Sequence, residues 1–142
     1  LMDQTETAIG KKVMQYFYPA GSIVRAGGKL AYGADWPVAT ANPLEGLEVA
    51  ITRQVAGDAK AKPLVASEGV SLAEAIESHT LNVAAVNGMA KFTGSLETGK
   101  NADLVVLDRD IFKLPVHQIS KAKVLVTVFQ GKPVYGDLGT LR

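Results

Sequence analysis

Asp35 is the residue whose type and position are best suited to chemistry. It ends a short apolar run over residues 29–34, which has the length of a β-strand and is bounded by Gly28 and Pro37. A carboxylate at the C-terminal end of a strand lies where α/β proteins collect ligands and catalytic groups. Because Asp also starts turns, the spacing alone favours a turn over a catalytic role.

Few other side chains could serve as metal ligands or nucleophiles. The chain has two histidines and no cysteine, which excludes disulfides, thiolate ligands and a cysteine nucleophile within it. His79 falls in a predicted helix, where we expect it to pack or cap. His117 follows Pro115 in a short connector, where we expect it at the surface. A catalytic zinc site needs about three protein ligands, more than this chain brings to Asp35.

Composition and charge set broad limits. The chain has 142 residues, 47% of them hydrophobic, enough for one domain with a core. Its 15 basic and 14 acidic residues give no electrostatic reason to expect nucleic acid or an anionic membrane as a partner. No apolar run has membrane-spanning length, and the first ten residues lack a signal-peptide pattern, so we expect a cytoplasmic protein.

The first two thirds of the chain alternate between helical and strand patterns. Apolar spacing predicts helices over residues 5–18 and 20–26, then the strand that ends at Asp35. A further helix is predicted over residues 44–55, with Asn42 as its N-cap and Pro43 at its first position. The apolar stripe of that helix leaves Glu48 among its polar residues. This order of elements is typical of a parallel α/β sheet.

Two more helices are predicted before the pattern changes to strand periodicity at Gly94. Ser71 and Glu74 fit a capping box, and a second short helix is predicted over residues 80–87. Strands are predicted over residues 103–108, 124–130 and 133–135, with a two-residue turn at Gly131 and Lys132. One helical turn is expected at 115–120. The acidic residues Asp103, Asp108 and Asp110 lack the spacing of a calcium loop, so we interpret them as solubilising charges at strand ends.

Five stretches together carry a family resemblance. They are residues 32–38 (Tyr-Gly-Ala-Asp-Trp-Pro-Val), 42–46, 79–84, 94–108 (Gly-Ser-Leu-Glu-Thr-Gly-Lys-Asn-Ala-Asp-Leu-Val-Val-Leu-Asp) and 124–135. In this order they resemble the C-terminal part of the metal-dependent amidohydrolases of the amidohydrolase family 3 subgroup. The run over residues 94–108 is the most specific.

The resemblance implies an α/β fold, with this chain as the C-terminal fragment of a (β/α) TIM barrel that has terminal helices and an appended small β-sandwich layer. Residues 1–92 would belong to the barrel and residues 93–142 would supply strands of a composite sandwich. A full barrel takes about 250 residues, so the chain is expected to be one portion of a longer enzyme. Alone it would expose apolar edges, so we expect self-association or pairing with the missing N-terminal part of the barrel.

The resemblance further implies a metal-dependent hydrolase of non-peptide carbon–nitrogen bonds in small amide-type substrates, inactive as an isolated fragment. Asp35 would bind one divalent metal ion, zinc in our expectation, and exchange a proton with the metal-bound water. The other ligands would lie outside this chain. Ala34 stands where the family has Ser, a small-for-small change. Trp36 is expected to pack at the barrel rim or line the substrate pocket.

Two alternatives stay open. The chain could be a catalytically dead remnant that acts as an interaction or regulatory module through its exposed edge. It could also belong to a deaminase or lactonase of the same superfamily, because those enzymes use the same kinds of metal ligands.

Overall fold

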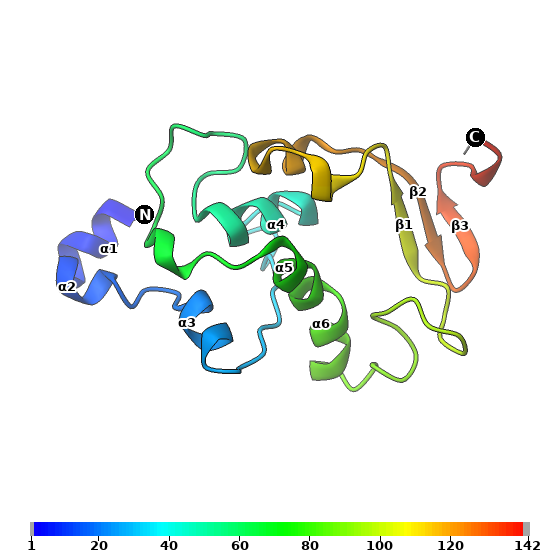
Figure 1. Cartoon of the computed structure of the whole chain (residues 1–142), viewed down its shortest axis with the longest axis horizontal. Helices are drawn as coiled ribbons and strands as arrows, with labels where there is room; N and C mark the ends of the chain where they lie inside the picture. Colours follow the sequence, from blue (N-terminus) through cyan, green and yellow to red (C-terminus); the bar gives the residue numbers. More distant parts are fainter. Residues whose placement is uncertain (1, 141–142) are drawn as a thin grey trace.

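The computed structural model describes residues 2–140, with helices in the first two thirds and a small antiparallel sheet near the C-terminus (Figure 1). The α-helices are α1 (Met2–Ile9), α2 (Lys11–Met14), α3 (Ala20–Arg25), α4 (Pro43–Thr52), α5 (Leu72–His79) and α6 (Leu81–Val86). The strands are β1 (Leu104–Leu107), β2 (Val124–Phe129) and β3 (Lys132–Tyr135). Short 3₁₀ helices are η1 (Ala66–Glu68), η2 (Ile111–Lys113), η3 (Val116–Lys121) and η4 (Leu138–Thr140). The fold is therefore mixed α/β.

The helix predicted over residues 5–18 is not continuous. Gly10 has φ +79° and separates α1 from α2, and α2 ends at Met14. A backbone in the left-handed region cannot continue a right-handed helix, and glycine adopts it without a Cβ penalty. The prediction of one long helix was wrong because it followed apolar spacing and ignored this glycine.

The strand predicted over residues 29–34 is also absent. The segment is irregular, and Tyr32 N–H donates to Ser78 O at 3.0 Å, a bond to a helix rather than to a strand. A parallel strand needs a neighbouring strand to pair with, and the part of the chain that the structure describes places none beside it. The expected barrel wall is therefore not formed within residues 2–140.

The two predicted helix caps are confirmed. The Asn42 side chain accepts a hydrogen bond from Leu44 N–H at 3.1 Å at the start of α4. At the start of α5, Ser71 Oγ accepts from Glu74 N–H and the Glu74 carboxylate accepts from Ser71 N–H, a reciprocal capping box. Both caps fix the first turn of a helix that borders the core.

The core lies where α4 packs against α5 and η3 (Figure 1). Extended segments tie this layer together, since Val70 N–H donates to Ala50 O at 3.1 Å and Leu64 N–H donates to Arg53 O at 2.7 Å. Burial of apolar side chains at this junction supplies the main stabilisation of the helical region. The buried core residues are Ala20, Leu44, Leu47, Ala50, Val70, Ala75, Ile111, Ile119 and Ala122.

The C-terminal sheet has the order β1-β2-β3, with both pairs antiparallel. The hairpin between β2 and β3 turns at Gln130 and Gly131, with φ +49° and +79°, one residue earlier than predicted. Val126 and Val128 are buried, whereas Leu125 and Phe129 on the opposite face are exposed. A second sheet against that exposed face is not found among residues 2–140, so the sandwich layer stays a prediction.

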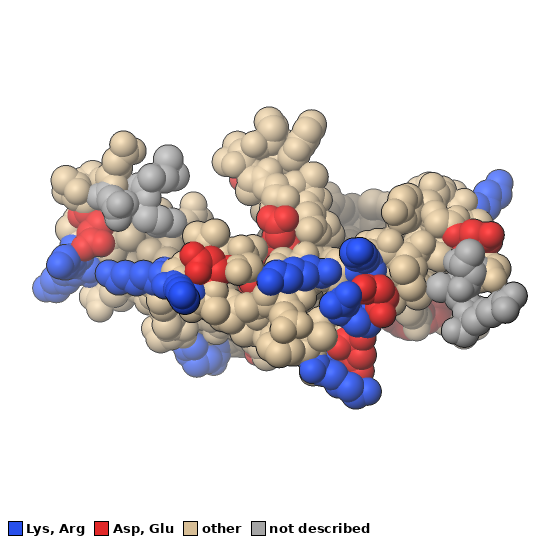
Figure 2. Space-filling model, turned by 90° about the horizontal axis from the view of Figure 1, so that it is seen from above, with Lys and Arg blue, Asp and Glu red and all other residues tan. Residues whose placement is uncertain are grey.

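The charged side chains are distributed without a dominant sign. On the face seen in Figure 2, Lys and Arg lie next to Asp and Glu, and a mostly uncharged lobe projects between two hollows. Across residues 2–140, every helix is too short or too polar to cross a membrane.

Candidate functional site

Asp35 lies in an exposed loop between the irregular segment at Tyr32 and the N-terminus of α4. Its φ is +48°, and its carbonyl accepts a hydrogen bond from Val38 N–H at 2.8 Å, so it opens a turn. Its carboxylate is exposed and makes no hydrogen bond or ion pair with any residue in the range 2–140. The turn interpretation and an available carboxylate are therefore compatible here.

The residues after Asp35 also project into solvent. The Trp36 side chain is 71% exposed and Val38 is 86% exposed. The Trp36–Pro37 peptide bond is cis. Packing of Trp36 into a rim, one of the two roles predicted for it, is not formed within the described residues, so the side chain is free to contact a ligand.

A cavity of about 570 Å³ adjoins this loop. Gly33 and Ala34, just before Asp35, line it on one side, and Ala39 and Thr40, just after the turn, line it on another. The helix α4 contributes a further part of the wall, from Pro43 to Ala50. Asp35 therefore belongs to a loop whose two ends border the cavity.

His79 lines this cavity and also the second cavity described below, and it has the packing role predicted for it. Its Nδ1 lies 2.8 Å from Ala75 O, and its ring centroid is 5.1 Å from that of Tyr32. Nδ1 therefore carries the proton that bonds Ala75 O, and the ring fits against Gly46, where an added Cβ would come within 2.9 Å of Nε2. Burial raises the pKa of the Tyr32 hydroxyl, partly offset by Arg53.

Asp35 has no metal-ligating companions nearby. Within residues 2–140, no three His, Cys, Asp or Glu side chains are close enough together to hold a metal ion. A catalytic zinc needs about three protein ligands. The described residues can therefore supply one ligand of such a site, Asp35, but not the full set of ligands.

A second carboxylate, Glu48 on α4, occupies the opposite environment and was missed as a site residue. It is 0% exposed, although it was predicted on the polar face of its helix. Oε1 accepts from Gly57 N–H at 2.6 Å and Oε2 from Ser120 N–H at 2.9 Å. Glu48 lies four residues after Leu44, on the same side of the helix, which is the one local signal that could have revealed its burial.

His117 faces Glu48 rather than solvent, which corrects the prediction of a surface residue. Its Nδ1 is buried 3.6 Å from Glu48 Oε1, and its side chain is 27% exposed. Burial of Glu48 raises the pKa of its carboxyl, but hydrogen bonds from Ser120 and Gly57, together with His117, outweigh burial and hold the pKa below its ordinary value. This cluster joins α4 to η3 and lies apart from the loop of Asp35.

Glu68 makes a similar internal anchor. Its carboxylate accepts from Ser22 N–H and Ser22 Oγ, both at 2.6 Å, and pairs with Arg25 at 3.3 Å. The hydrogen bonds from Ser22, and then Arg25, hold the pKa of Glu68 below its usual value. The carboxylates of Glu68 and Glu48 are therefore occupied by structural hydrogen bonds.

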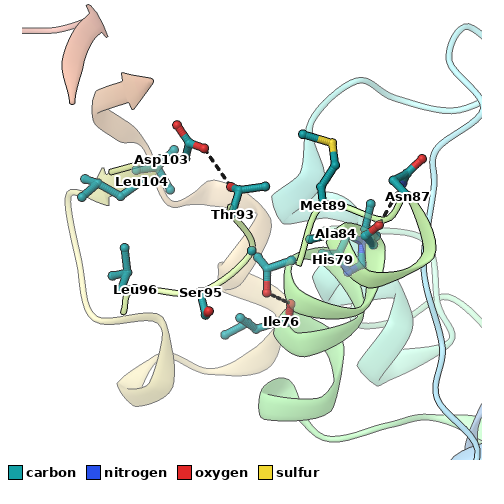
Figure 3. A pocket seen from close by; sticks show the side chains of 14 residues that line it. Ile76, His79, Ala84, Asn87, Met89, Thr93, Ser95, Leu96, Asp103 and Leu104 are labelled. Carbon is teal, nitrogen blue, oxygen red and sulfur yellow. Dashed lines mark hydrogen bonds between the residues drawn. The ribbon is translucent and has the colours of Figure 1, made fainter. Parts of the chain in front are cut away.

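A second cavity, of about 660 Å³, lies between α5–α6 and the segment that leads into β1 (Figure 3). Its polar side chains are already bonded: Thr93 Oγ1 donates to Asp103 at 2.8 Å, and Asn87 donates to Val83 O at 2.8 Å (Figure 3). Asp103 also accepts from Gln130 N–H at 2.7 Å. This cavity is an apolar groove without an available carboxylate.

The remaining acidic residues at the sheet edges hold loops in place. Asp108 pairs with Arg109 and accepts from Lys123 N–H at 2.8 Å, and these contacts, the Arg109 hydrogen bond above all, lower its pKa to about 2. Asp110 caps η2 by accepting from Phe112 N–H at 3.0 Å. They serve as anchors at the strand ends.

Comparison with known proteins shows which family and which relatives the chain resembles. The sequence model of the amidohydrolase family matches residues 2–135. The chain is 32% identical over 123 residues to an N-substituted formamide deformylase from Arthrobacter pascens, covering 87% of this chain and 22% of that protein. It is 30% identical over 129 residues to a 5-methylthioadenosine/S-adenosylhomocysteine deaminase from Symbiobacterium thermophilum, covering 84% and 29%.

Among solved structures, an amidohydrolase from Thermotoga maritima MSB8 aligns with 90% of this chain and 36% of that chain, at a TM-score of 0.45 and 18% identity. The chain spans less than a third of the length of the two curated relatives. Because the family match extends over nearly all of its residues, the chain belongs to the amidohydrolase family.

Proposed function

We propose that this chain is the C-terminal part of a metal-dependent hydrolase of non-peptide carbon–nitrogen bonds in small amide-type substrates. In this proposal Asp35 is a metal ligand and the group that accepts and returns a proton. The observation that carries it is the Asp35 carboxylate, exposed and without a partner among residues 2–140, in a loop whose two ends border a cavity. Family membership and the two relatives named for C–N chemistry support it.

The environment of Asp35 suits this role. A carboxylate that neither hydrogen-bonds nor pairs within the fold keeps its lone pairs for a cation or a proton. A bound zinc-type ion would supply a water of pKa about 7 as the nucleophile. Asp35 could then hold the proton of that water and pass it to the departing nitrogen. Every other part of the metal site would have to come from outside the described residues.

The division of the chain is part of the same proposal. Residues 1–92 would complete the barrel, and residues 93–142 would form one layer of a composite sandwich. The exposed apolar side chains of Val105, Leu125 and Phe129 support this division, because a sheet face of this kind is normally covered. We propose that strands from an N-terminal part of the enzyme cover it.

The test is Asp35→Asn in the longer enzyme that contains this chain. Asn keeps the size and the turn but binds metal and protons poorly. Loss of general acid–base action alone lowers turnover about 100-fold or more. Amide hydrolysis would be followed with added zinc, with Asp58→Asn in an exposed loop as the matched control. Full activity in Asp35→Asn would refute the proposed role.

The second candidate function is a catalytically inactive interaction or regulatory module. The incomplete ligand set among residues 2–140 favours it for the isolated polypeptide. Calorimetric titration of the 142-residue chain with zinc separates the two. Tight stoichiometric binding with hydrolysis would refute the inactive module, whereas lack of binding confines the enzyme proposal to a longer chain.

A further inference from the structure

We infer that the 570 Å³ cavity beside Asp35 receives an uncharged, apolar substituent of the substrate. The inference rests on the proposed function and narrows it from amides in general to amides with such a group. It comes from the walls of the cavity, the state of its polar groups and its position next to the Asp35 loop.

The walls are apolar and built from small residues. Ala34, Ala39 and Ala41 line the loop side, and Val49 and Ala50 line the helix side. The volume falls in the range of roughly 300–1,000 Å³ found for small-molecule sites. Small side chains leave room for a ring or a branched aliphatic group in van der Waals contact with α4.

Several polar groups in the walls are committed to the fold, whereas the buried Tyr32 hydroxyl has no hydrogen-bond partner among residues 2–140. Asn42 Oδ1 accepts from Leu44 N–H at 3.1 Å, and Asn42 Nδ2 donates to Glu45 Oε1 at 3.4 Å. His79 uses Nδ1 for Ala75 O, and its Nε2 faces Gly46. No Lys or Arg lines the cavity, and Glu45 is its one charged residue. An anion would therefore enter without a counter-charge, which is strongly unfavourable.

The position links the cavity to the proposed chemistry. The chain passes from Ala34 in the wall, through Asp35 and its turn, and back to the wall at Ala39. A substrate whose amide reaches Asp35 can thus place a neighbouring substituent in the cavity. Burial of that substituent would fix the orientation of the amide.

Three probes of nearly equal shape and different charge test the inference: benzamide, benzoate and benzamidinium. Each would be titrated into the metal-free 142-residue chain, with the backbone amide signals of Gly33, Ala34 and Gly46 followed by NMR. We expect benzamide to shift these signals and to bind at least about tenfold more tightly than benzoate. We also expect it to bind more tightly than benzamidinium, because the apolar walls penalise removal of the cation from water and Glu45, half-exposed and already hydrogen-bonded by Asn42 Nδ2, is a weak counter-charge.

Two variants locate the binding. Ala41→Phe places a ring in the cavity mouth and should abolish the benzamide shifts. Ala59→Phe makes the same change in an exposed loop away from the cavity and should leave them unchanged. Both spectra report directly whether the chain is folded.

Equal binding of all three probes, tightest binding of benzamidinium through Glu45, or no binding at all would each overturn the inference. So would benzamide shifts that survive in Ala41→Phe. The measurement uses neither metal nor turnover, so its failure leaves the Asp35 proposal intact. Loss of that proposal through an active Asp35→Asn enzyme would be a separate result.

Discussion

The carboxylates of Glu48 and Asp35 lie in opposite environments, one in the buried junction of α4 with η3 and the other in an exposed loop. Glu48 is fully buried, and each of its oxygens accepts a backbone N–H, one from Gly57 and one from Ser120. Asp35 is exposed and bonds none of residues 2–140 through its side chain. The Glu48 carboxylate holds separate segments of the chain together, whereas the Asp35 carboxylate is available to a ligand.

The difference teaches how to separate structural from functional acids in this chain. A buried carboxylate needs hydrogen bonds or an ion pair, because its removal from water is otherwise strongly unfavourable. Glu48 and Glu68 meet this condition with partners 72 and 46 residues away in sequence. Asp35 makes no such bonds, so its carboxylate is available to a ligand, while the residue type also suits the turn at φ +48°.

The largest expected effect comes from Glu48→Gln. Both Glu48 oxygens accept N–H groups, so a Gln amide would place its NH₂ against a backbone donor and leave that donor unpaired. We expect a loss of about 1.5–3 kcal/mol in the free energy of unfolding, the usual range for a hydrogen bond to a charged group.

Urea denaturation followed by circular dichroism would measure this loss. Glu45→Gln, three residues earlier on α4 and partly exposed, is the control and should cost less than about 1 kcal/mol. Equal effects of the two substitutions would mean that Glu48 is not an anchor.

Acid should weaken the same junction. The pKa of Glu48 is held below its ordinary value in the folded chain, so its contribution is fully present above the unfolded carboxyl pKa of about 4.3. Stability is then lost as the pH falls from there through the lower folded pKa. Thermal unfolding between pH 7 and pH 3 should show this decline.

Glu68 and Glu74 also have lowered pKa values, from hydrogen bonds with Ser22 and Ser71, and they add to the decline. Glu48→Gln should therefore flatten the acid decline without removing it. An unchanged slope in that variant would contradict the role of Glu48.

Local features of the sequence predicted local structure well. The Asn42 cap and the Ser71–Glu74 capping box depend on residues two or three positions apart, and both formed as predicted. The hairpin between β2 and β3 was found within one residue, because Gly131 marks its turn. These elements are decided by neighbours in the sequence.

Features that depend on distant partners were not predicted. Glu48 is held by Ser120 and His117, which no local pattern connects to α4. The segment over residues 29–34 has a strand pattern but no adjacent strand within residues 2–140, so the pattern has nothing to pair with. The metal role of Asp35 came from family resemblance and stays a prediction.

A smaller effect is expected at the contact between the cavity wall and the core. Gly46→Ala adds a Cβ within 2.9 Å of His79 Nε2, and overpacking of this kind costs about 1–3 kcal/mol. The gain in helix propensity offsets about 1 kcal/mol of that cost. We therefore expect a net loss of about 1 kcal/mol in urea denaturation. In a His79→Ala background the same substitution should instead stabilise the chain, and a loss there would exclude His79 as the cause.

The smallest effect is expected from Asp35→Asn in the 142-residue chain. The Asp35 side chain makes no bond that Asn would break, and Asn tolerates the left-handed φ of +48° as well as Asp does. The free energy of unfolding should therefore stay within about 0.5 kcal/mol of the parent chain, as for a surface substitution. A loss as large as that of Glu48→Gln would show that Asp35 is itself a structural anchor. The contrast between the two carboxylates, and with it the case for Asp35 as an available ligand, would then fail together.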